Sequence, residues 1–312
     1  MEETRALPPV VAVIGPTAVG KSTLALQLAR RFGGEIITAD SRQVYRYMDI
    51  GTDKPGRAER DLAPHHMIDL VDPDEAYTLA LYQEGAYATI DDVLSRGNLP
   101  IVAGGTPLYV NAVLEGWTIP RVEPDLALRA GLEKEAEEHG SEHLHASLKG
   151  LDPTAAAGIL PSNTRRIIRA LEVVLLTGEP ISVQQRKVAP PYRMLTVGIT
   201  CPRKELYRRI DSRVDRQIDA GLVDEVASLL GRGYLSTLPS MSGLGYRQIG
   251  GYLLGMSTLE ESIQRIKWDT HAFARHQANW FRRAGEANWI DTLESDALTT
   301  ASDLVEGFLS GA

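Results

Sequence analysis

Cysteine is almost absent from this chain, because Cys201 is the only one among 312 residues. A disulfide within the chain is therefore impossible, and a reducing compartment, the cytoplasm, is the expected setting. Long apolar runs are absent too. None approaches the roughly 18 residues of a membrane-spanning helix, so we expect a soluble protein with no membrane partner. Residues 1–9 also lack the apolar stretch of a secretion signal.

Net positive charge is lacking as well, since the formal charge is −8 at pH 7. This balance weakly disfavours a nucleic-acid partner, although clustered basic residues can override it. Such residues gather in three groups in the second half of the chain, from Arg165 to Arg193, from Arg203 to Arg216 and from Arg265 to Arg283. One group alone is most simply a solvated helix face, whereas three together predict a basic surface.

A complete phosphate-loop pattern, G-x-x-x-x-G-K-[ST], is present at residues 15–22. An apolar run at 10–14 precedes it and a helical apolar pattern follows it, so the order is strand, loop, helix. The N–H groups of such a loop bind an anion, Lys21 adds a positive charge, and the Ser22 hydroxyl can reach Mg²⁺. The pattern predicts that a diphosphate or polyphosphate is held by Gly15, Pro16, Thr17, Ala18, Val19, Gly20, Lys21 and Ser22.

The order of the other elements predicts an α/β fold with a phosphate-loop (P-loop NTPase-like) parallel-sheet core. Strands are expected at 10–14, 35–39, 99–103, 194–200 and 288–291. Helices are expected after the loop and at 77–95, 107–114, 125–148, 163–177, 203–220, 223–232 and 258–283. Residues 120–190 contain no convincing strand. We therefore predict a core domain of residues 1–119 and 191–312 and a helical insertion domain of residues 120–190.

The acid that phosphate-loop ATPases place after a second apolar strand to hold Mg²⁺ is missing. The expected strand 99–103 ends in Gly104-Gly105-Thr106, and Asp40, after the strand at 35–39, is the nearest acid. Asp40 can be a metal ligand, a general base or a structural cap. No Cys or His pattern has the spacing of a transition-metal site. Small-molecule kinases, and enzymes that release a diphosphate, both remain compatible with the loop.

Segments spread over nearly the whole chain resemble the tRNA dimethylallyltransferases, also called tRNA isopentenylpyrophosphate transferases. They are GPTAVGKS at 15–22, DSRQVY at 40–45, MDIGT at 48–52, KP at 54–55, PHH at 64–66, VAGGT at 102–106, RALE at 169–172 and GYRQ at 245–248. Ser22 stands where many members carry Thr, and the hydroxyl is retained.

The resemblance implies transfer of a dimethylallyl group from dimethylallyl diphosphate to N6 of adenosine 37 in tRNA, with Mg²⁺ as cofactor. It implies that the loop holds the diphosphate, that Thr17 and Arg213 contact it, and that Asp40 is the general base. It further implies contacts with the tRNA anticodon stem-loop from four segments, and we expect a monomer. These segments are Asp40, Ser41, Arg42 and Gln43; Thr106; Arg165, Arg166, Ile167, Ile168 and Arg169; and Ser242, Gly243, Leu244, Gly245, Tyr246 and Arg247.

Three alternatives stay open. A related adenylate isopentenyltransferase would prenylate a free nucleotide, but the insertion and the basic second half favour tRNA. A nucleotide or small-molecule kinase would bind and consume ATP at the same loop, and a non-catalytic RNA-binding module would not need Asp40.

On the expected helix at 163–177, Arg165 and Arg169 lie four residues apart, so we expect both to be exposed toward tRNA.

Overall fold

The computed structural model describes residues 7–282, 287–294 and 296–311. The chain divides into two compact units, a core unit of Met1–Leu114 with Pro190–Ala312 and an insertion unit of Glu115–Ala189. The boundaries expected from the sequence lie at 119/120 and 190/191.

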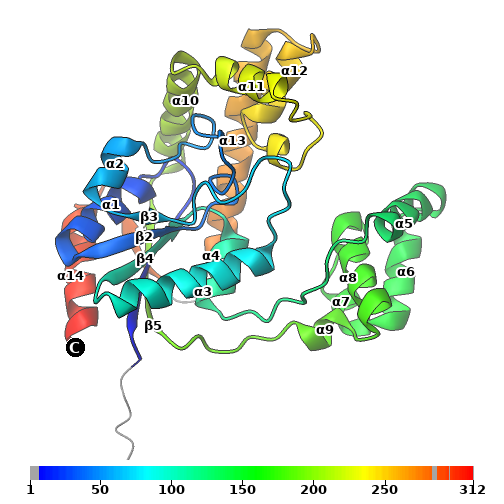
Figure 1. Cartoon of the computed structure of the whole chain (residues 1–312), viewed down its shortest axis with the longest axis horizontal. Helices are drawn as coiled ribbons and strands as arrows, with labels where there is room; N and C mark the ends of the chain where they lie inside the picture. The colour runs from blue at the N-terminus through cyan, green and yellow to red at the C-terminus, as the bar shows by residue number, and fades with distance from the viewer. Residues whose placement is uncertain (1–6, 283–286, 295, 312) are drawn as a thin grey trace, which may run out of the picture. The chain divides into compact units, whose positions relative to one another are not determined.

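The core unit is built on a six-stranded, all-parallel sheet with the strand order β3-β2-β4-β1-β5-β6 (Figure 1). The strands are β1 (Pro9–Ile14), β2 (Gly34–Thr38), β3 (His65–His66), β4 (Leu99–Gly104), β5 (Arg193–Thr200) and β6 (Asn288–Asp291). The predicted α/β fold is thus confirmed. The two-residue strand β3 was not predicted, because it is too short to carry a periodic pattern.

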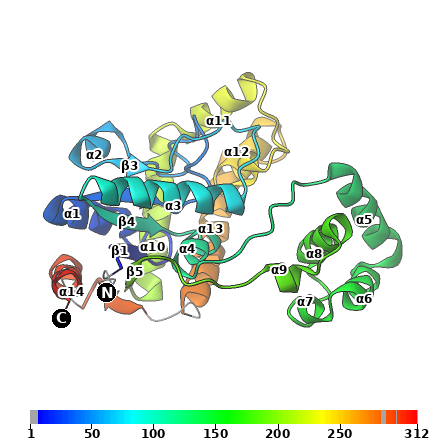
Figure 2. The same ribbon diagram turned by 60° about the horizontal axis from the view of Figure 1, so that its bottom comes forward.

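Chain direction decides which face of the sheet each helix covers. The step from β1 to β2, which contains α1, runs one way across the sheet, and the step from β3 to β4, which contains α3, runs back. Right-handed crossovers therefore place α1 (Lys21–Phe32) and α3 (Leu79–Ser95) on opposite faces. The remaining helices of the core are α2 (Arg57–Leu62), α4 (Pro107–Leu114), α10 (Arg203–Asp219), α11 (Leu222–Gly231), α12 (Tyr246–Leu253), α13 (Leu259–Phe281) and α14 (Ala297–Ser310) (Figure 2).

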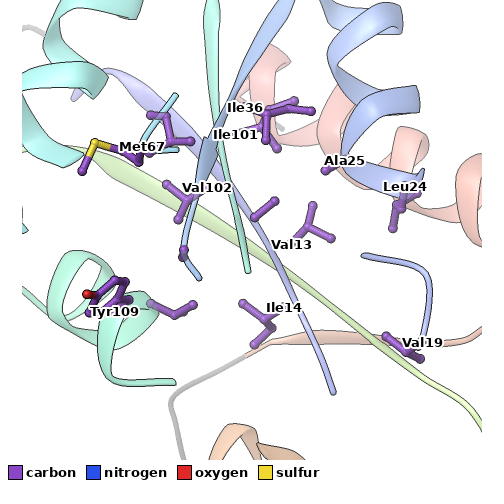
Figure 3. Packing of buried hydrophobic residues seen from close by; sticks show 14 of the residues in the cluster. Val13, Ile14, Val19, Leu24, Ala25, Ile36, Met67, Ile101, Val102 and Tyr109 are labelled. Atoms are coloured by element: carbon purple, nitrogen blue, oxygen red, sulfur yellow. The ribbon is translucent and has the colours of Figure 1, made fainter. Parts of the chain in front are cut away.

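The core is packed on both sides of the central strands (Figure 3). Successive residues of a strand point to opposite faces, so Val13 and Ile101 pack toward Leu24 of α1. Their neighbours Ile14 and Val102 pack on the other side. All these strand residues are at most 1% exposed, as expected for strands covered on both faces.

The insertion unit is a helical bundle with its own apolar core (green in Figure 1). Its helices are α5 (Leu126–His139), α6 (Ser141–Leu151), α7 (Pro153–Ala157), α8 (Thr164–Thr177) and α9 (Ile181–Gln184). The single helix expected at 125–148 is wrong. Gly140, with φ of +86°, ends α5 and starts α6 in another direction.

Three helices of the core were not predicted, α2, α12 and α14. The glycines of α12 hid its helical pattern in the sequence. The long helix expected at 258–283 is α13, and Arg283 lies outside the described residues. None of the described helices combines the length and apolar character needed to cross a membrane.

Candidate active site

The phosphate loop joins β1 to α1 at the carboxyl edge of the sheet. Gly15 has a φ of +151°, and a Cβ on it would lie 2.4 Å from the carbonyl oxygen of Ile199 in β5. Only glycine therefore fits at this close approach of two strands. Lys21, the first residue of α1, donates to the carbonyl oxygen of Pro16 at 2.7 Å, so the loop curls around its side chain.

Lys21 lies in an environment that disfavours its own charge. Burial and the positive charge of Arg213 lower the pKa of the Lys21 ammonium to about 7, although Asp40 and Asp53 attract the charge. An anion bound beside Lys21 would relieve both the desolvation and the repulsion. This end of the site is therefore suited to a phosphate group.

Asp40 is brought to the loop by close packing of the ends of β2 and β4. The residue before it, Ala39, donates to the carbonyl oxygen of Ala103 at 2.8 Å. A Cβ at Gly104 would lie 2.1 Å from the Ala39 carbonyl oxygen, so glycine is needed there. The Arg42 N–H donates to Asp40 Oδ1 at 2.8 Å, and no described residue donates to Oδ2. One carboxylate oxygen is thus fixed, and the other is free to accept from a ligand.

Thr17 is held from two helices. From α10, Arg213 Nη1 donates to Thr17 Oγ1 at 3.1 Å, and Arg213 also lies 3.4 Å from Asp53. From α13, Gln277 Oε1 accepts from the Thr17 N–H at 2.9 Å, while Gln277 Nε2 donates to the Gly105 carbonyl oxygen at 2.5 Å. Because Thr17 Oγ1 accepts from Arg213, its own proton is available to a third group.

Two adjoining cavities meet at these residues. The first, about 210 Å³, follows the loop and is lined by polar groups that include Lys21, Ser22 and Thr23. The second, about 280 Å³, has an apolar wall made of Ile210, Val214, Leu244 and Ile266. Both are lined by Thr17, Asp40, Thr52, Arg213 and Phe273. The site therefore suits a ligand with an anionic head and an apolar tail, with Asp40 at the junction.

The predicted tRNA-contact segments of the core come together around the second cavity. The Ser41 N–H donates to Thr106 Oγ1 at 3.0 Å. The Arg42 guanidinium donates to the Pro239 and Ser240 carbonyl oxygens at 2.5 and 3.1 Å and to Ser242 Oγ at 3.2 Å. Ser41, Arg42, Thr106, Ser242, Gly243, Leu244 and Tyr246 all line this cavity.

Like Arg42, three further side chains predicted to contact tRNA are engaged within the protein. Gln43 is buried and donates to the Thr52 and Asp53 carbonyl oxygens at 3.0 and 3.2 Å. Tyr246 is 1% exposed, and its hydroxyl donates to Glu225 at 2.6 Å. Arg247 is exposed but pairs with Asp269 at 2.9 Å. Gly245 is buried.

In the insertion unit, α8 separates its predicted contact residues by depth. Arg165 and Arg166 are exposed, whereas Ile167 and Ile168 are buried in the core of the unit. The expectation that Arg169 is exposed like Arg165 is wrong. Its guanidinium is half-buried, pairs with Glu172 at 2.5 Å and donates to the Val122 and Pro120 carbonyl oxygens at 3.2 and 3.4 Å.

Several residues of the site carried no signal in the sequence. Gln277 and Phe273 come from α13, far along the chain from the loop, and no motif marks them. Glu225 of α11 accepts from three successive backbone N–H groups at 3.0, 2.7 and 3.2 Å, those of Asp49, Ile50 and Gly51. It thereby fixes the loop that carries Thr52 into the cavities. In the sequence, only the segments MDIGT at 48–52 and KP at 54–55 indicated a role for this loop, and neither pointed to Glu225.

The residues present fit Mg²⁺ only as an ion shared with a phosphate ligand. Ser22 and Asp40 offer oxygen atoms to the first cavity. Among the described residues, however, no three His, Cys, Asp or Glu side chains are grouped to hold a metal ion. Mg²⁺ usually binds through one or two protein oxygens, several waters and substrate phosphates.

Known proteins match this chain along most of its length. A family model described as IPP transferase matches residues 43–284, and one described as isopentenyl transferase matches residues 8–64. The tRNA dimethylallyltransferase of Roseiflexus castenholzii is 58% identical over 289 residues, which are 93% of this chain and 94% of that protein. That of Thermomicrobium roseum is 54% identical over 286 residues, which are 92% and 87% of the two chains.

Solved structures of tRNA-modifying prenyltransferases also match this chain along most of its length. The tRNA isopentenylpyrophosphate transferase of Bacillus halodurans is 40% identical, with a TM-score of 0.71, and the match covers 97% of this chain and 96% of that one. A eukaryotic dimethylallyltransferase acting on tRNA is 26% identical with a TM-score of 0.83, and the match covers 97% and 80% of the two chains.

Proposed function

The chain belongs to the tRNA dimethylallyltransferases and is thus a tRNA-modifying prenyltransferase, and we propose that it acts on N6 of adenosine 37, giving N6-isopentenyladenosine. The donor proposed is dimethylallyl diphosphate. The observation that carries the proposal is the pair of joined cavities, with Lys21 in the polar one, an apolar wall in the other, and Asp40 in both.

The diphosphate would lie along the phosphate loop, residues 15–22. Its charge grows as the bond to the dimethylallyl carbon breaks, so groups that bind the charged product more strongly than the reactant accelerate the step. Lys21 and Arg213 supply two positive charges, and the Thr17 hydroxyl can donate the proton that its bond from Arg213 leaves free. Mg²⁺, held by Ser22 and the diphosphate, would neutralise part of the same charge.

Asp40 would act as the general base. The N6 lone pair of adenine is delocalised into the ring, so the amine is a weak nucleophile. As N6 bonds to the dimethylallyl carbon, the carbon–oxygen bond breaks and the electron pair leaves with the diphosphate. The free Oδ2 of Asp40 then accepts the N6 proton, which requires a heavy-atom distance of about 2.6–3.2 Å.

The acceptor adenine would reach the junction through the second cavity. A base stacked in the anticodon loop must leave the stack to enter such a pocket. Ser41, Thr106 and Ser242 line that cavity and can bond to base edges or backbone, as single-stranded RNA recognition requires. Arg165 and Arg166 of the insertion unit are exposed for phosphate contact.

One experiment tests the proposal against its alternatives. The protein is incubated with dimethylallyl diphosphate, Mg²⁺ and an unmodified tRNA that has adenosine at position 37, and digested RNA is analysed by mass spectrometry. We expect N6-isopentenyladenosine with wild type and almost none with Lys21→Ala. Parallel reactions offer AMP as acceptor, and ATP without donor. Prenylated AMP alone, or ATP turnover that depends on Lys21 without prenylated tRNA, would contradict the proposal.

A further inference from the structure

We propose that Gln277 is a positioning residue for the transfer, because its amide fixes the backbone of Thr17 and so sets where the Thr17 hydroxyl points. This inference rests on the proposed function, in which that hydroxyl binds the departing diphosphate. None of the sequence segments quoted for the family resemblance contains Gln277. Its bond to Thr17 spans 260 residues of the chain, so it becomes visible only in the folded structure.

The side chain of Gln277 is placed as a bridge between two loops. It is 3% exposed, and both ends of its amide are bonded. The oxygen accepts from the Thr17 N–H at 2.9 Å, and the nitrogen donates to the Gly105 carbonyl oxygen at 2.5 Å. A Cβ at Gly105 would lie 2.8 Å from Gln277 Nε2, so a glycine makes room for the amide. The amide therefore ties the loop after β1 to the turn after β4.

Thr17 is consequently fixed at two points. Gln277 holds its backbone N–H, and Arg213 donates to its hydroxyl oxygen at 3.1 Å. With the backbone held and one side of the oxygen occupied, the hydroxyl proton has a restricted range of directions. Thr17 lines both cavities, so this direction matters to a ligand there. A misplacement of about 1 Å in such a group can cost on the order of 100-fold in rate.

Anchoring of α13 does not depend on this amide. Phe281 and Ala274 of the same helix are fully buried in the core. Lys267 pairs with Asp215 of α10 at 2.7 Å. The bond to Thr17 is thus a local addition to a helix that is already fixed, which favours a role in the site over a role in folding.

Gln277→Met tests the inference, because methionine has a similar length but can make neither bond. Gln264→Met is the matched control, since Gln264 is exposed on the same helix. We expect Q277M to lower the single-turnover rate, with donor and tRNA saturating, by roughly 30-fold. Its tRNA Kd should stay within about twofold of wild type, and Q264M should transfer at the wild-type rate.

A double-mutant cycle decides whether Gln277 acts through Thr17. In a Thr17→Val background the hydroxyl is gone, so adding Q277M should lower the rate by less than about threefold. Multiplicative losses would mean that Gln277 acts independently of the Thr17 hydroxyl, and a wild-type rate for Q277M would mean that the bridge contributes nothing to transfer. If Q277M lowered the melting temperature and the tRNA affinity together with the rate, Gln277 would have a structural role only. Each of these results overturns the inference. Absence of transfer by the wild type would instead refute the proposed function.

Discussion

The core unit and the insertion unit use their charged side chains in different ways. In the core, Lys21, Asp40 and Arg213 all line one cavity, and no described residue donates to Oδ2 of Asp40. In the insertion, Glu172 is 0% exposed, but its oxygens accept from Arg129 at 2.7 and 2.8 Å and from Arg169 at 2.5 Å. The core keeps hydrogen-bonding capacity for a ligand, whereas the insertion satisfies its buried charge internally.

The hydrogen bonds of Glu172 show that its role is structural, in contrast to the role proposed for Asp40. Burial alone would raise the pKa of the Glu172 carboxyl, but hydrogen bonds from Arg129 and Arg169 hold that pKa below its usual value. Glu172 also accepts from the N–H of Asp125, the residue that caps α5, at 2.9 Å. A charged residue with all its partners inside the protein therefore stabilises a fold. One with a free atom facing a cavity is a candidate for catalysis.

The largest expected effect follows from removing the free carboxylate. Asp40→Asn keeps the size and the oxygen that Arg42 binds but is no longer a base. We expect the single-turnover rate to fall on the order of 10²–10⁴-fold, the usual cost of losing a general base. The Kd for tRNA should change little, which filter binding can measure. A rate within tenfold of wild type would show that Asp40 only caps its loop.

The matching change in the insertion should act on stability instead. Glu172→Ala leaves Arg129 and Arg169 without their partner, and breaking a buried ion pair costs about 3–5 kcal/mol. Hydrogen exchange should therefore speed up in α5 and α8, and tRNA binding should weaken. Titration with dimethylallyl diphosphate should give the wild-type affinity. A variant that lost donor binding but kept slow exchange in α5 and α8 would contradict the division between the units.

A smaller effect is expected from the exposed arginines of α8. Neutralising Arg165 and Arg166 together removes two charges that are not engaged in the core of the unit. We expect tRNA affinity to fall by about tenfold and the slope of log K against log salt to flatten by roughly 0.7–0.9 per charge. Arg169→Gln is the contrasting variant, because its charge is already paired with Glu172. If the double variant had the same salt slope as wild type, Arg165 and Arg166 would be exposed to solvent without contacting tRNA phosphates.

The smallest expected effect is a pH-dependent change in stability at Glu35, an acid of the core whose carboxylate is fully hydrogen-bonded within the protein. Burial alone would raise the pKa of this carboxyl, but hydrogen bonds from three neighbours lower it to about 2. These neighbours are Arg96, Asn98 and His66. A carboxyl whose pKa is lower when folded stabilises the protein above its ordinary pKa, and that stability is lost as the pH falls toward 2.

Urea unfolding of wild type and Glu35→Gln at several pH values measures this contribution. The difference between them should be constant near pH 7 and shrink as the pH falls below about 4.5. Transfer at pH 7 should be unchanged in the variant if it remains folded. A stability difference independent of pH would mean that Glu35 is not ionised in the folded protein.

Local order along the chain was predictable, and long-range pairing was not. The strand, loop and helix at residues 10–32 follow from apolar runs and one glycine pattern, all within a short stretch. The bond between Gln277 and Thr17 joins residues 260 positions apart, and no pattern in either segment predicts it. For Arg169, local spacing gave a wrong prediction, because residues distant in the sequence help to decide its exposure. Its spacing from Arg165 predicts a shared face, but residues 120–122 and Glu172 cover it.

The proposed reaction is tested most directly by a crystal structure of the protein with diphosphate, Mg²⁺ and an anticodon stem-loop that carries unmodified adenosine 37. We expect diphosphate oxygens within hydrogen-bond distance of Lys21 and Arg213. We expect the adenine N6 at about 2.6–3.2 Å from Asp40 Oδ2. An adenine bound away from the junction of the two cavities, with Asp40 facing only protein groups, would refute the proposed role of Asp40.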